Sequence, residues 1–215
     1  MASLSRLTSE QWGMVTADEA RDLVVSRVDV ARLIEDGTLE RVGNAARVYR
    51  LTGSPPDPEL DGLRAAWLQL GQGNPASMRV RRPDAVASHR SAARALGLGD
   101  LTADVHEFYV ARRRQPRRTD LRLRVRSALP DRDWRVVVGL PVCTAARIVG
   151  DLLVDREDES ALARICQDAM RADLLSLDEL VDLSGPHAKV YGHPSGRAFS
   201  MTLAGVDAPR EVTEV

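Results

Sequence analysis

The chain has 215 residues, of which 44% are hydrophobic and 28% are charged, and its formal net charge is −1. This composition is typical of a folded globular protein, and it excludes both wholesale disorder and an attraction to nucleic acid through bulk charge. Two cysteines are too few for a disulfide framework, and no apolar run is long enough to be a leader or a membrane span. We therefore expect a cytoplasmic protein with no membrane partner.

Charge is distributed unevenly along the chain. Residues 76–126 contain 13 arginines and five acidic residues, whereas residues 150–183 contain ten acidic residues and three arginines. Two segments of opposite sign are typical of a protein with two partners, and they also occur where charged faces are merely solvated. Both interpretations remain open at this stage.

The first expected module covers residues 1–53. A brief extended piece is expected at residues 14–15, after a short amphipathic segment. Thr16 and Glu19 have the spacing of a capping box, in which each side chain satisfies a free backbone amide of the other residue. The box predicts a short helix over residues 17–24.

A second helix is expected over residues 27–36, with Ser26 as its N-terminal cap and Gly37 at its end. Its buried stripe consists of Val30, Leu33 and Ile34. The residues that point away from this stripe are Val28, Ala31, Arg32 and Glu35, with Arg27 in the first turn. A helix that exposes small residues and arginines suits the major groove of DNA, where arginine can bond to guanine through two hydrogen bonds.

Two short alternating strands follow around a Gly-Asn turn at residues 43–44 and predict a β-hairpin. Three arginines of this hairpin are placed to contact phosphates: Arg41, Arg47 and Arg50. The order of elements predicts a winged helix-turn-helix that binds double-stranded DNA. A scaffold used only for protein contacts is the alternative, because residues 1–53 contain seven arginines and eight acidic residues.

Residues 54–58 are rich in proline and are expected to form a linker. Residues 59–185 are expected to form a second, α+β domain, a small sheet covered by helices. Helices are predicted from Asp57 to Leu70, 84–96, 145–154, 159–172 and 176–183, and strands over 105–111, 121–126, 134–138 and 140–142. In the strand 121–126 we expect Leu121, Leu123 and Val125 on one face. Residues 186–215 are expected to form a partly ordered extension with a short strand over 198–203.

The most distinctive feature of the second domain is the basic hairpin over residues 112–126. Its candidate residues are Arg112, Arg113, Arg114, Arg117, Arg118, Arg122, Arg124 and Arg126. They form either a second surface for phosphates or an acidic partner, or an exposed sheet face whose arginines prevent edge aggregation and pair with the acidic helices. The sequence does not decide between these interpretations.

Residues for catalysis do not converge in the sequence. The four histidines are scattered, neither cysteine has a histidine nearby, and no phosphate-binding loop or nuclease motif occurs. We expect His187 and His193 to be exposed to solvent. We therefore expect a protein that is not an enzyme, with no catalytic residues, no metal site and no cofactor.

The chain resembles the AbiEi-type antitoxins of bacterial type IV toxin–antitoxin systems. The resemblance lies in WGMVTADEARDLVVSRVDVARLIEDGTLERVGNAARVYRLTG, AVASHRSAARALGLGDL and GLPVCTAARIVGDLL, and it spans about residues 9–185. Cys143 and Ala145 stand where threonine and proline are expected in the family. We do not expect the additional nuclease-like domain that some relatives carry.

The resemblance implies a winged helix that represses its own operon and a second domain that neutralises a nucleotidyltransferase-like toxin encoded by the adjacent gene. It implies DNA contacts at Ser26, Arg27, Arg32, Arg41, Arg47 and Arg50, and Asn44 at the hairpin turn completes the candidate set. The alternative function is a one-component transcriptional regulator whose α+β domain senses a ligand or forms dimers.

Overall fold

A computed structural model describes residues 7–206, except residues 24, 72–73, 75 and 115–117. Contacts within the chain define two compact units. The first unit comprises residues 1–86, 108–128 and 136–141, and the second comprises residues 87–107, 129–135 and 142–215. The fold contains both helices and sheets and is α+β, as the sequence predicts.

The first unit begins with one helical turn at residues 7–9, the strand β1 (Met14–Thr16) and the helix α2 (Ala17–Asp22). The predicted capping box is confirmed, since the Thr16 side chain accepts a hydrogen bond from the Glu19 backbone and the Glu19 carboxylate accepts one from the Thr16 backbone. Glu19 is buried, and its carboxylate also accepts hydrogen bonds from the Thr16 hydroxyl at 2.8 Å and from Gln11 Nε2 at 3.0 Å. A buried carboxylate needs such donors, so this network fixes the start of α2.

The helix α3 (Arg27–Glu35) follows α2 and begins at the Ser26 cap, as expected. Gly37 ends this segment with a φ of +77°, a left-handed conformation that glycine adopts without strain. The strands β2 (Leu39–Arg41) and β3 (Val48–Leu51) then pair in antiparallel register, with Leu39 opposite Leu51. Because β1 also pairs with β3, the small sheet has the order β1-β3-β2.

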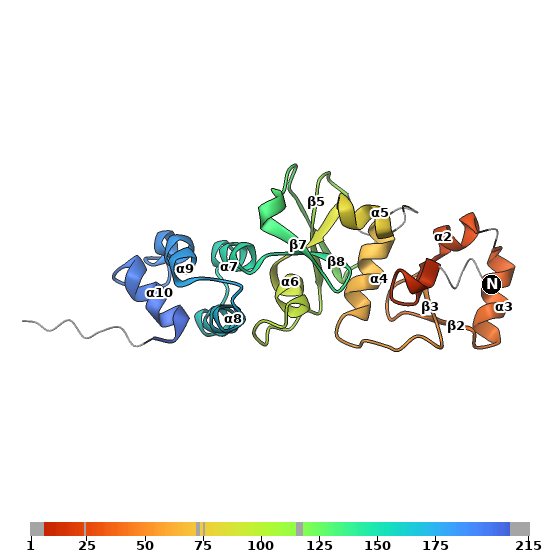
Figure 1. Ribbon diagram of the computed structural model, residues 1–215, viewed down its shortest axis with the longest axis horizontal. Coiled ribbons are helices and arrows are strands. Elements are labelled where there is room, and N and C mark those ends of the chain that lie inside the picture. The colour runs from red at the N-terminus through yellow and green to blue at the C-terminus, as the bar shows by residue number, and fades with distance from the viewer. Residues whose placement is uncertain (1–6, 24, 72–73, 75, 115–117, 207–215) are drawn as a thin grey trace, which may run out of the picture. The chain divides into compact units, whose positions relative to one another are not determined.

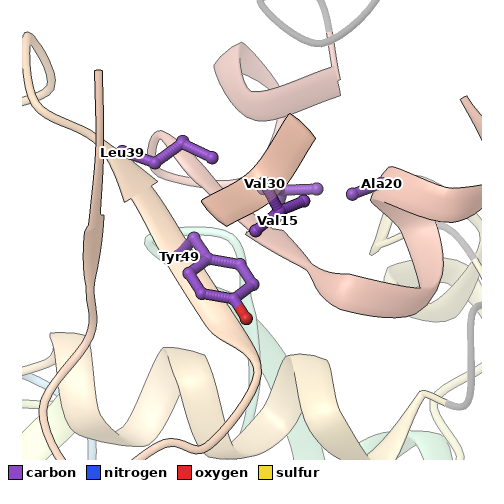
Figure 2. Packing of buried hydrophobic residues seen from close by; sticks show 5 residues of the cluster. All are labelled: Val15, Ala20, Val30, Leu39 and Tyr49. Atoms are coloured by element: carbon purple, nitrogen blue, oxygen red, sulfur yellow. The ribbon is translucent and has the colours of Figure 1, made fainter. Parts of the chain in front are cut away.

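A hydrophobic cluster holds these elements together. Figure 2 shows side chains from β1, α2, α3 and the two hairpin strands directed toward a common centre; these are Val15, Ala20, Val30, Leu39 and Tyr49. Leu33 and Ile34 pack against the cluster from α3, which confirms the predicted stripe. Each element therefore contributes at least one apolar side chain to a shared core, and burial of these side chains stabilises the arrangement.

The helix α4 (Asp61–Leu70) packs against β1 and β3, with Leu63 and Trp67 among its buried residues. It begins later than predicted, because residues 58–60 form a turn. The predicted linker is tied to this helix: the Asp57 backbone donates to Asp61 at 2.9 Å, and Asp57 accepts from Arg64 at 2.7 Å. A short helix that the sequence did not indicate, α5 (Ala76–Arg81), comes next.

A five-stranded sheet has the order β6-β5-β4-β8-β7. Its strands are β4 (Ala85–Ala87), β5 (His106–Val110), β6 (Leu121–Val125), β7 (Trp134–Val137) and β8 (Leu140–Cys143). Four of them confirm predicted strands. The apolar face predicted for β6 is partly open to solvent in this edge strand, because Val125 is 55% exposed and Leu121 and Leu123 are half-buried.

Residues 84–96 do not form the single helix that was predicted. Ala85–Ala87 is a buried strand that pairs in parallel with β8, and only α6 (His89–Ala95) is helical. The Ala85 carbonyl accepts a hydrogen bond from the indole of the buried Trp67 at 2.9 Å. Pairing with distant residues thus overrides the helical propensity of an alanine-rich segment.

The second unit contains a group of packed helices: α7 (Ala145–Val154), α8 (Glu159–Arg171), α9 (Leu177–Ser184) and α10 (Gly196–Ala204) (Figure 1). The Ser176–Glu179 capping box at the start of α9 is confirmed. The strand predicted over residues 198–203 is wrong. Ser195 caps α10, Phe199 and Leu203 are buried one turn apart, and Gly205 ends the helix with a φ of +69°.

We predict that replacement of Glu19 by glutamine lowers the free energy of unfolding by about 1–2 kcal/mol, because the donors around the buried carboxylate lose a charged acceptor. Urea denaturation followed by far-UV circular dichroism measures this change. The Glu35→Gln variant, at an exposed position of α3, is the control and should change stability by less than about 0.5 kcal/mol. Equal effects of the two substitutions would contradict the role given to the Glu19 network.

Candidate nucleic-acid interface

The exposed side of α3 is fixed by its cap and by its buried side. The Ser26 hydroxyl accepts from the Asp29 backbone at 3.1 Å and donates to the Asp29 carboxylate at 2.6 Å. The Ser26 backbone amide also donates to this carboxylate, at 3.0 Å. The hydrogen bond from the Ser26 hydroxyl and, to a smaller extent, the one from its backbone lower the pKa of Asp29. The Ser26 hydroxyl is therefore already used within the cap, although the sequence placed it among the DNA contacts.

The opposite side of α3 is exposed, as expected. Its solvent-exposed residues are Arg27, Val28, Ala31, Arg32 and Glu35. Because Val30, Leu33 and Ile34 face the hydrophobic cluster, these five side chains cannot turn inward without breaking the core.

A surface hollow lies beside α3 within the first unit. Its lining comes from α2, α3 and the hairpin and consists of Ala17, Asp18, Arg21, Val25, Arg27, Val30, Ala31, Ile34, Arg41, Arg47 and Tyr49. Four of these residues are arginines and one is acidic. Arg41 lies over the Tyr49 ring, with its guanidinium carbon 5.6 Å from the ring centre. A concave surface with this excess of positive charge attracts polyanions such as the DNA backbone.

Asp18 is the acidic residue of the hollow. Its carboxylate pairs with Arg47 at 2.9 Å and with Arg21, and all three side chains are about half exposed. Exposed pairs of this kind contribute at most about 1 kcal/mol, so a phosphate can displace the carboxylate. Asp18 and Arg21 are not among the site residues that the sequence predicts. The sequence signal that could have indicated this pair is the spacing of Asp18 and Arg21, which lie one helical turn apart on the exposed side of α2.

Arg50 differs from Arg41 and Arg47, the other arginines of the hairpin, in that carboxylates hold its side chain. Its side chain is only 13% exposed, its Nε donates to Glu40 at 2.8 Å, and its guanidinium also pairs with Asp61. Glu40 lies opposite Arg50 in the β2–β3 register. We therefore leave Arg50 out of the candidate interface. Asn44 and Arg47 remain exposed at the turn between β2 and β3.

The basic hairpin over residues 112–126 exposes fewer arginines than the sequence indicates. Arg114 donates to the Leu70 carbonyl at 2.5 Å and pairs with Asp84 at 3.3 Å, and Arg118 is held by Asp120 and Gln69. Arg126 lies over the Tyr109 ring at 5.1 Å. Arg124 is half-buried, and Arg117 lies outside the described residues. Among the described candidate residues there, Arg112, Arg113 and Arg122 are exposed.

The cysteines and the histidines of the C-terminal segment are buried or half-buried. Cys143 and Cys166 are buried, and burial raises the pKa of Cys166 to about 12, which removes this thiol as a nucleophile at neutral pH. His193 is half-buried rather than exposed as predicted, because its ring stacks on Phe199 and lies 3.1 Å from the Glu159 carboxylate. His187 is half-buried as well.

Among the residues that the structure describes, no group of three or more His, Cys, Asp or Glu side chains could hold a metal ion. None of the described helices combines the length and apolar character needed to cross a membrane. Comparison of the sequence with protein-family models and with curated proteins found no match.

We predict that Asp18→Asn raises the affinity for duplex DNA by about two- to fivefold, because it frees Arg47 and Arg21 from an exposed carboxylate. Fluorescence anisotropy with a labelled duplex at fixed ionic strength measures the change. The Asp22→Asn variant, exposed on the same helix and absent from the hollow, controls for net charge. An equal rise for both variants would show that bulk charge, rather than the pair, limits binding.

Arg32 is expected to contact a base rather than the backbone, since it lies on the outward side of α3. Replacement by alanine should reduce discrimination at one base pair by about 1–3 kcal/mol. The value is the difference in binding free energy between a duplex selected from a randomised library and the single-base variants of that duplex. The control is Arg197→Ala, at an exposed position of α10. A uniform loss over all sequences would instead assign Arg32 to a phosphate.

Proposed function

We propose that the protein binds operator DNA through a winged helix-turn-helix formed by residues 7–53 and acts as an antitoxin that represses its own operon. The order of elements supports the first half of this proposal. A helical turn, β1, α2, α3 and the β2–β3 hairpin follow one another, and β1 joins the hairpin through β3. In such a module α3 is the recognition helix and the hairpin is the wing.

The observation that carries the proposal is the clustering of exposed arginines along α3 and the hairpin. Arg27, Arg41 and Arg47 line one hollow with Arg21, and Arg32 lies on the outward side of the same helix. The recognition helix can then contact base edges while the wing and α2 contact phosphates.

The antitoxin half of the proposal is supported by the resemblance of the sequence to the AbiEi-type family and by one face of α9. Four exposed residues lie side by side on this helix: Leu177, Asp178, Val181 and Asp182. An apolar strip bordered by carboxylates suits a partner protein with a basic surface. We therefore propose α9 as the contact for the toxin.

Other acidic residues of this region are engaged within the second unit. Asp151 pairs with Arg147, Glu157 with Arg90, and Asp168 with Arg171. The acidic character of residues 150–183 is thus partly internal pairing, and Asp178 and Asp182 of α9 are among the carboxylates that remain exposed.

The experiment that tests the function is co-expression of the protein with the gene adjacent to its own. We expect growth to be rescued from a toxic neighbour, and we expect the protein to retard the DNA upstream of its operon in a mobility-shift assay. A harmless neighbour combined with specific DNA binding would favour the one-component regulator. Absence of both activities would contradict the proposal.

Charge reversal on α9 tests the proposed contact with the toxin separately from the proposed DNA binding. The double variant Asp178→Arg, Asp182→Arg should lose rescue and keep its affinity for DNA. The control is Asp104→Arg, at an exposed acidic position outside α9, which should keep both activities. Circular dichroism checks that each variant is folded. Full rescue by the double variant would exclude α9 as the contact.

A further inference from the structure

Val28 is an exposed apolar side chain on the face of α3 that the core leaves free. It is 61% exposed, and among the described residues of 7–53 no other large hydrophobic side chain is exposed to this degree. It lies in the first turn of α3, two positions after the Ser26 cap. Ala31, one turn further along, is exposed as well.

Folding does not account for a valine at this position. Val28 takes no part in the hydrophobic cluster, which α3 contacts through Val30, Leu33 and Ile34. A β-branched residue is also less favourable in an exposed helix than alanine, lysine or glutamate. The fold would therefore be equally stable, or more stable, with a polar residue there.

The charges around Val28 indicate what covers it. Arg27 precedes it and Arg32 lies one turn away, and both are exposed. The hollow lined by Arg21, Arg41 and Arg47 borders the same helix. An apolar spot bordered by cations matches the major groove of a duplex, where phosphates flank the base edges and the C5-methyl group of thymine is the apolar feature.

We propose that Val28 contacts the methyl group of a thymine and so specifies a thymine in the operator. The inference rests on the proposed DNA binding and names a base that α3 selects. Val28 buries its exposed methyl groups against the thymine methyl, while Arg27 and Arg32 bond to neighbouring polar groups of the DNA. Cytosine at the same position lacks the methyl group and is disfavoured.

Deletion of a single methyl group from the DNA tests the contact. A duplex is first selected from a randomised library with the wild-type protein. Each thymine is then replaced in turn by uracil, which keeps every Watson–Crick group. We expect one thymine in each bound site at which the wild-type affinity falls about three- to fivefold, the factor that burial of one methyl group supplies.

The Val28→Ser variant should bind the thymine and uracil duplexes equally, because the apolar partner is gone. Serine and valine have similar helix propensities, so the fold of α3 is kept. The matched control is Val154→Ser, a helical valine of α7 that is 68% exposed, and it should show the wild-type sensitivity.

The proposal is overturned if Val28→Ser keeps the full sensitivity to uracil while still binding DNA, an outcome that leaves the proposed function intact. It is also overturned if Val28→Ser alters the association state in sedimentation equilibrium and leaves the sensitivity unchanged, since Val28 is then a contact between copies of the chain. A wild-type protein that selects no duplex overturns both the inference and the proposed DNA binding.

Discussion

The interface depends on how one side of α3 is held in the hydrophobic cluster. Val30, Leu33 and Ile34 supply the apolar contacts of this helix, and the remaining positions face solvent. Since the cluster also takes side chains from β1, α2 and the hairpin, the same burial fixes the position of α3 relative to Arg41 of β2 and to Arg47 in the turn before β3. A substitution that loosens the cluster would therefore disturb the proposed DNA binding without changing any residue that is proposed to contact DNA.

Carboxylates decide which arginines are available to a polyanion. Arg50 is largely buried and is held by two carboxylates, the half-exposed Glu40 and the largely buried Asp61, so it is engaged within the fold. Arg47 shares the exposed Asp18 with Arg21, in a pair that is weak enough to exchange for phosphate. Arg114 and Arg118 are likewise bound to neighbouring groups. A net charge of −1 and a local positive surface are thus compatible within one chain.

Features set by local chemistry could be predicted from the sequence, and features set by distant pairing could not. The Thr16–Glu19 and Ser176–Glu179 capping boxes depend on residues three positions apart, and the α3 stripe on helical spacing. The strand β4 depends instead on β8 and on Trp67, which lies 18 positions from Ala85. Within the site, the exposure of the α3 arginines could be predicted from helical periodicity. The pairing of Arg50 could not, because it depends on the hairpin register and on a carboxylate of α4. The helix α10 was missed because Gly196 and its neighbours resemble a loop until the burial of Phe199 and Leu203 is known.

Hydrogen–deuterium exchange of the full chain, with and without the selected duplex, tests the central claim most directly. Amides of α3 and of the β2–β3 hairpin, residues 26–36 and 39–51, should exchange more slowly when the duplex is bound, and those of α9 should be unaffected. Protection confined to the second unit, with none in α3, would contradict the assignment of α3 and the hairpin as the surface that binds DNA.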